Sequence, residues 1–62
     1  MKKKRFYGIW EVSKKDWMRC FYNDATYAFD TEEAAKKYAA YNWGYDTYEE
    51  VVRDDWAIVK PL

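Results

Sequence analysis

Few side chains in this 62-residue sequence could perform covalent or acid–base chemistry. It contains no histidine, the commonest general base and metal ligand in proteins. Ser13 is the only serine and has no candidate base partner. Cys20, the only cysteine, lies in a predicted strand, where a buried structural thiol is more common than a nucleophile. We therefore expect a protein that is not an enzyme and that uses no metal and no cofactor.

Acidic residues occur as three adjacent pairs, which could in principle supply an acid and a base. The first pair lies where a helix should begin, and the other two lie in segments expected to be solvated turns. Structural explanations are therefore favoured for all three: Glu32–Glu33, Glu49–Glu50 and Asp54–Asp55. Gly8 and Gly44 are isolated, so there is no glycine-rich phosphate-binding loop.

The charges suggest binding surfaces instead. The net charge is zero, but residues 1–20 carry seven basic and two acidic side chains, and residues 21–62 carry four basic and nine acidic ones. Basic groups interleaved with aromatic rings are typical of sheets that bind nucleic acids. The candidates for that surface are Lys2, Lys3, Lys4, Arg5, Trp10, Lys14, Lys15, Trp17 and Arg19. A simpler explanation is that the N-terminus is solubilising and that the two halves neutralise each other in the fold.

Two further surfaces are candidates for contact with another protein. The acidic segment, residues 46–55, could meet a basic partner through Asp46, Glu49, Glu50, Asp54 and Asp55, although it could also be a solvated loop. The other candidate is aromatic, because 14 of the 62 residues are Trp, Tyr or Phe. A domain this small cannot bury every ring, and exposed aromatic patches mark interfaces.

Length and cysteine content define the class of protein. A chain of this length forms a single domain, residues 1–62, in which residues 1–4 are expected to be a flexible basic arm. No disulfide can form within the chain, and a lone cysteine suits a reducing compartment, so we expect a cytoplasmic location. No stretch approaches the roughly 20 apolar residues of a membrane span.

Hydrophobic patterning predicts the elements that position these residues. Residues 5–13, 17–22, 25–29 and 56–60 are predicted strands, with a hairpin turn at Asn23–Asp24. Alternation does not choose the inner face of the first strand. In the second it predicts that Met18, Cys20 and Tyr22 point into the core.

A helix is predicted after the third strand, with Asp30 as its N-cap and Gly44 as its C-cap. Its buried face should carry Ala34, Ala35, Tyr38, Ala39 and Tyr41, with Glu33, Lys36, Lys37 and Ala40 opposite. Residues 45–55 fit either a loop with a short helix or a strand at 48–53. The predicted fold class is α+β: a small antiparallel sheet of three to four strands with one α-helix packed on one face.

The run Phe29-Asp30-Thr31-Glu32-Glu33-Ala34-Ala35, followed by Tyr38, resembles the join between sheet and helix in AP2-type DNA-binding domains. The arm-type DNA-binding domains of tyrosine integrases look similar there. The resemblance covers residues 7–42 and implies a sheet that enters the DNA major groove through arginines and tryptophans. The first-strand arginines of those families fall near Tyr7 and Trp10, and Arg19 is the one sheet arginine here.

Two functions follow as hypotheses. The first is a small non-enzymatic module that binds another protein, an adaptor or inhibitor of the kind encoded by phages or mobile elements. The alternative is a DNA-binding domain that uses its antiparallel sheet in the manner of an integrase arm domain. The expected partner is another protein, with nucleic acid as the alternative and no membrane, and the expected state is a monomer or weak homodimer.

Overall fold

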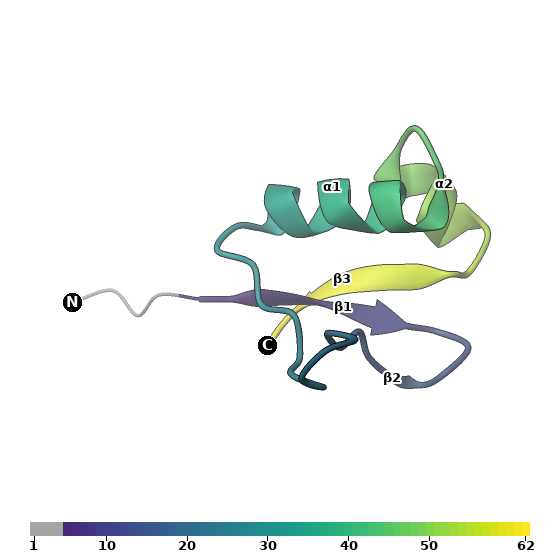
Figure 1. Ribbon diagram of the computed structural model, residues 1–62. Coiled ribbons are helices and arrows are strands. Elements are labelled where there is room, and N and C mark those ends of the chain that lie inside the picture. Colours follow the sequence, from purple (N-terminus) through teal and green to yellow (C-terminus); the bar gives the residue numbers. More distant parts are fainter. Residues whose placement is uncertain (1–4) are drawn as a thin grey trace.

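An antiparallel sheet with two helices on one face makes up the fold. A computed structural model describes residues 5–62, so the predicted arm at residues 1–4 lies outside the described residues. The elements follow in the order β1 (Tyr7–Glu11), β2 (Asp16–Trp17), α1 (Glu32–Trp43), α2 (Tyr48–Arg53) and β3 (Ala57–Pro61). The strands lie in the order β2-β1-β3, and Figure 1 shows both helices on the same side of the sheet. The predicted α+β class is confirmed, with three strands and a second helix.

Strand β1 is central, and its pairing decides which of its faces is buried. Ile9 lies opposite Val59 and is fully buried against the helices. Trp10 lies opposite both Trp17 and Ile58. Because successive side chains in a strand point to opposite faces, Trp10 lies on the face that α1 and α2 leave uncovered.

Two of the predicted strands are wrong in extent. Within residues 17–22 only Trp17 belongs to a regular strand, and residues 25–29 form only isolated bridges, Arg19 with Thr26 and Tyr7 with Phe29. The reason is a change of partner. The Tyr27 N–H donates to the Met18 carbonyl at 3.1 Å, whereas Phe29 exchanges two backbone hydrogen bonds with Tyr7 at 2.8 and 2.9 Å. The segment crosses from one neighbour to the other, so no continuous ladder forms.

The predicted inward set of the second strand is correct for Met18, which is buried, and wrong for Tyr22, which is 92% exposed. Cys20 is half-buried. The turn begins earlier than alternation suggested, because the Asp24 N–H already donates to the Cys20 carbonyl at 2.9 Å. Residues beyond Cys20 therefore leave the sheet and no longer follow its two-residue period.

Thr31, and not Asp30, caps helix α1. The Thr31 hydroxyl accepts a hydrogen bond from the Ala34 N–H at 3.1 Å. The predicted C-cap is confirmed: Gly44 has a φ of 76°, in the left-handed region, and its N–H points to the carbonyls of Ala40 and Tyr41.

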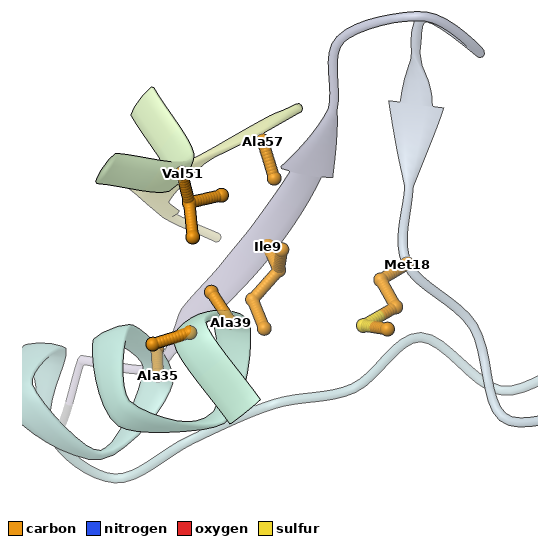
Figure 2. Close-up of a cluster of buried hydrophobic side chains, with 7 residues drawn as sticks. Ile9, Met18, Ala35, Ala39, Val51 and Ala57 are labelled. Atoms are coloured by element: carbon orange, nitrogen blue, oxygen red, sulfur yellow. The ribbon is translucent and has the colours of Figure 1, made fainter. Parts of the chain in front are cut away.

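The buried face of α1 is rotated relative to the prediction. Ala35 and Ala39 are buried as expected, but Ala34 and Tyr41 are exposed and Ala40 is buried. Helix α2 explains the difference, since it packs against α1, and Ala40 lies beside residues 46–49 at the start of α2. Figure 2 shows the resulting core between the helices and β1. Its members are Ile9, Met18, Ala35, Ala39, Ala40, Val51 and Ala57.

The segment that the sequence left open contains α2. The Glu50 carboxylate accepts from both the N–H and the hydroxyl of Thr47, at 3.2 and 3.0 Å, and closes the N-terminal turn. Val51 is fully buried in the core. The Tyr48 hydroxyl reaches β3, where it accepts from the Val59 N–H at 2.8 Å. Residues 45–55 are therefore a loop with a short, capped helix, Tyr48–Arg53, and the alternative strand at 48–53 is excluded.

Candidate functional site

Two adjacent aromatic side chains protrude at the tip of the loop after β2. Phe21 and Tyr22 are each 92% exposed, and their rings meet edge to face at 5.6 Å between centroids. We call this pair the aromatic tip. The two rings contribute almost nothing to the core, so their exposure has no explanation in the stability of the fold.

The loop beneath the aromatic tip is tightly hydrogen-bonded. The Cys20 N–H donates to the Ala25 carbonyl at 2.7 Å, and the Asn23 side-chain oxygen accepts from the Ala25 N–H at 3.0 Å. Asp24 adopts a φ of 58°, which Asn and Asp tolerate better than other non-glycine residues. A turn is thus present where it was predicted, but it is longer than the predicted two-residue hairpin turn at Asn23–Asp24: residues 21–24 form the loop between Cys20 and Ala25, and the aromatic tip is part of that loop.

Arg19 lies beside the aromatic tip between two carboxylates. Its guanidinium is 3.3 Å from Asp16 and 3.5 Å from Asp24. These groups border an open hollow of about 410 Å³, which is also lined by Lys14, Trp17, Cys20 and Phe21. The two ion pairs hold the Arg19 side chain at the border of this hollow. They also compensate most of its positive charge.

The second candidate surface is the sheet face without helices, which we call the open face. Trp10 and Trp17 pack edge to face at 5.3 Å, and the Lys60 ammonium lies 5.0 Å from the centre of a Trp10 ring. The sheet therefore brings together two of the predicted nucleic-acid candidates and adds Lys60, which the sequence did not single out. Gly8 lies beneath the Trp17 ring, which a side chain at residue 8 would displace.

The other basic candidates are more dispersed. Lys14 and Lys15 lie in the turn between β1 and β2, where Lys14 is 3.6 Å from Glu11 and Lys15 adopts a φ of 53°. Arg5 is exposed just before β1. Lys2, Lys3 and Lys4 lie outside the described residues. The described basic groups thus border the sheet without forming one continuous patch.

The five acidic candidates divide into structural and available groups. Glu50 caps α2, and Asp54 accepts from the Tyr45 hydroxyl at 2.7 Å and pairs with Arg53 at 3.0 Å. The Tyr45 hydroxyl in turn accepts from the Trp56 indole N–H at 2.8 Å. The remaining three are exposed and have no ion pair within residues 5–62: Asp46, Glu49 and Asp55.

Hydrogen bonds shift the pKa values of several side chains within residues 5–62. Arg53 and then Tyr45 lower the pKa of Asp54, and Asp54 raises the pKa of Tyr45. Hydrogen bonding to the Tyr38 hydroxyl raises the pKa of Tyr27 to about 12. The backbone N–H groups of Tyr22 and Asn23 lower the pKa of the Cys20 thiol.

Within residues 5–62, no group of three or more His, Cys, Asp or Glu side chains could hold a metal ion. In the same residues no helix is long and apolar enough to cross a membrane. No protein-family model, no curated protein and no solved structure matches this chain.

Sequence reasoning missed the aromatic tip as a unit. Strand alternation put Phe21 outside and Tyr22 inside, because it carried the two-residue period past Cys20. A usable signal was present in the sequence, since both rings directly precede the turn residues Asn23 and Asp24. Lys60 was missed because only the register of β3 against β1 brings it to Trp10.

Proposed function

We propose that this protein is a non-enzymatic protein-binding module, an adaptor or inhibitor, that contacts its partner through the aromatic tip. The exposure of Phe21 and Tyr22 carries this proposal. Aromatic rings and arginines dominate the binding energy of protein interfaces, and Arg19 lies beside the pair. The short turn holds both rings in place, which reduces the entropy lost on binding.

Charge adds a second surface that can act on the same partner. The layer formed by residues 31–55 carries seven acidic and three basic side chains, so it gives the molecule a negative side remote from the aromatic tip. Asp46, Glu49 and Asp55 are free to steer a partner with basic groups, whereas Glu50 and Asp54 serve the fold. We infer a cytoplasmic protein that acts as a monomer or weak homodimer.

The test is site-specific photo-crosslinking in cells that express the gene. A photoreactive phenylalanine analogue at position 22 should give a discrete crosslinked species. The same analogue at position 41 is the matched control, since Tyr41 is 80% exposed but lies on α1. The double change Phe21→Ser and Tyr22→Ser should abolish complex formation without changing the melting temperature. Equal crosslinking from positions 22 and 41, or full binding by the double variant, would show that the aromatic tip is not the contact.

The alternative function, nucleic-acid binding by the sheet, is favoured by one observation. The open face places Trp10, Trp17 and Lys60 together, and aromatic rings beside cations form platforms on which bases stack. Affinity for a short oligonucleotide should then fall with salt, with a log–log slope of about 0.7 per contact for single strands or 0.9 for duplex. Lys60→Gln should weaken this binding, whereas the aromatic-tip variant should not. Affinity that is absent, or that does not change with salt, would contradict this alternative.

A further inference from the structure

The two outer edges of the sheet differ in how their backbone groups are used. Two hydrogen bonds flank the pairing of β3 with β1: the Val12 N–H donates to the Trp56 carbonyl, and the Leu62 N–H donates to the Phe6 carbonyl. They show that the even-numbered residues of β3 direct their backbone N–H and carbonyl groups toward β1. Because these directions alternate along a strand, the backbone groups of Ala57, Val59 and Pro61 point outward, away from β1. The Val59 N–H is occupied by the Tyr48 hydroxyl, and Pro61 has no N–H. This edge is therefore protected against pairing with another strand.

The opposite edge lacks such protection. Tyr27 and Phe29 direct their N–H groups inward, to Met18 and Tyr7, so the alternating residues Thr26 and Ala28 face outward. Both are exposed, and their backbone groups have no hydrogen-bond partner within residues 5–62. No charged side chain lies between residues 25 and 29. We call Thr26–Ala28 the free edge.

Aromatic rings line the free edge on its helix side. Tyr27 and Phe29 stack at 6.2 Å, as side chains two residues apart in an extended chain should. Tyr38 packs against both, at 5.3 and 5.5 Å, and Tyr41 follows at 6.3 Å from Tyr38. The first three rings are half-buried and Tyr41 is 80% exposed. The free edge thus combines unpaired backbone groups with incompletely covered apolar surface.

We propose that the free edge pairs with the free edge of a second copy of this chain. In an antiparallel pair with its two-fold axis at Tyr27, Thr26 exchanges both backbone hydrogen bonds with the partner's Ala28, and Ala28 does so with the partner's Thr26. In this register both Thr26 and Ala28 find a partner. A register shifted by two residues sets Thr26 opposite the partner's Thr26, or Ala28 opposite the partner's Ala28, and pairs only one of the two residues in this way. The sheet then continues across both molecules.

Three features favour a second copy as the occupant. Symmetric pairing sets Tyr27 directly opposite the partner's Tyr27, where aromatic cross-strand pairs are stabilising. It also brings the aromatic rows of the two molecules together, so each half-exposed ring is covered by a like surface. Finally, residues 25–29 carry no charge and the chain has zero net charge, so no overall repulsion opposes the approach of the copies. At each end of the pairing Asp24 comes near the partner's Asp30, and this like-charge contact keeps the association weak. Because the edge is short, the dissociation constant should be on the order of 100 µM.

The test uses the full chain and no other molecule. Sedimentation equilibrium from about 10 µM to about 1 mM should show reversible dimerisation. Hydrogen exchange at the amides of Thr26 and Ala28 should slow as concentration rises. Ala28→Pro removes only an outward-facing N–H and should raise the dissociation constant at least about tenfold. Thr26→Lys, which introduces like charges across the axis, should do the same if the proline variant fails to fold.

The matched control is Asn42→Lys, an exposed position on α1 with the same change in charge. It should dimerise like the parent, which separates edge pairing from general charge repulsion. A chain that remains monomeric at 1 mM, or a dimer unaffected by both Ala28→Pro and Thr26→Lys, would overturn the proposal. This inference does not depend on the aromatic tip: the Phe21→Ser and Tyr22→Ser double variant should still dimerise.

Discussion

The hydroxyl oxygen of Tyr48 accepts a hydrogen bond from the backbone N–H of Val59 at 2.8 Å. This contact joins α2 to the outer edge of β3 and supplies the only acceptor for that N–H within residues 5–62. One side chain therefore has two roles: it docks the second helix, and it closes an edge that another strand could otherwise extend.

Removal of this hydroxyl should both destabilise the fold and open the edge. Tyr48→Phe keeps the ring and leaves the Val59 N–H without its acceptor, so the free energy of unfolding should fall by about 1–2 kcal/mol. Chemical denaturation measures the loss, and hydrogen exchange at Val59 should accelerate. Tyr41→Phe, at an exposed position, is the control and should be neutral. A Val59 amide that exchanges equally fast in both variants would show that the bond is not formed in solution.

Gly8 should not tolerate even a methyl group. A Cβ there would lie 2.9 Å from the Trp17 ring and 2.7 Å from the Leu62 side chain. Leu62 is near the chain end and can move, but the Trp17 ring is held by Trp10. Gly8→Ala should therefore cost about 1–3 kcal/mol of stability, and the cost should shrink in a Trp17→Leu background. A double-mutant cycle by denaturant unfolding measures the coupling, and additive effects would mean that the ring moves aside freely.

The inward face of α1 can be tested at two of its alanines. Ala39 is fully buried against the sheet, and Ala34 is exposed. Ala39→Leu should destabilise the protein by about 1–3 kcal/mol through overpacking. Ala34→Leu should stay within about 0.5 kcal/mol of the parent. Thermal unfolding of the two variants decides between the observed face and the face that periodicity alone predicts, which includes both residues.

The sequence was informative where local signals decide the structure. β-Branched and aromatic residues located β1 and β3, and Gly44 located the end of α1. It failed where a distant segment decides. The inner face of β1 is set by its register with β3, the burial of Ala40 is set by α2, and residues 26–29 divide their hydrogen bonds between two partners.

The candidate site shows the same division. A turn near Asn23 and Asp24 could be predicted because these residue types tolerate left-handed backbone, which Asp24 adopts, but its four-residue length could not. The exposure of Tyr22 could not, because the turn starts at Cys20 and ends the strand period there. The acidic segment looked uniform in sequence, yet tertiary contacts commit Glu50 and Asp54 to the fold and leave Asp46, Glu49 and Asp55 free.

The network around Asp54 predicts how stability depends on pH. Arg53 and Tyr45 hold the pKa of Asp54 below its ordinary value of 3.8. A carboxyl whose folded pKa is lowered stabilises the fold above its unfolded pKa, and that contribution is lost as pH falls through the folded pKa. Asp54→Asn should therefore lower the melting temperature at about pH 6, and the difference from the parent should shrink as the pH falls below the ordinary pKa of the carboxyl and through its lowered folded pKa. Melting temperatures across this range provide the measurement.

The matched control for Asp54 is its neighbour. Asp55→Asn removes the same charge, and Asn suits the left-handed backbone that Asp55 adopts, with a φ of 59°. Because Asp55 has no ion pair within residues 5–62, its variant should melt like the parent from neutral pH down to the acid range. If both asparagine variants lost stability equally at neutral pH, the effect would come from the negative charge of the segment as a whole. A loss confined to Asp54→Asn would instead assign it to the contacts with Arg53 and Tyr45.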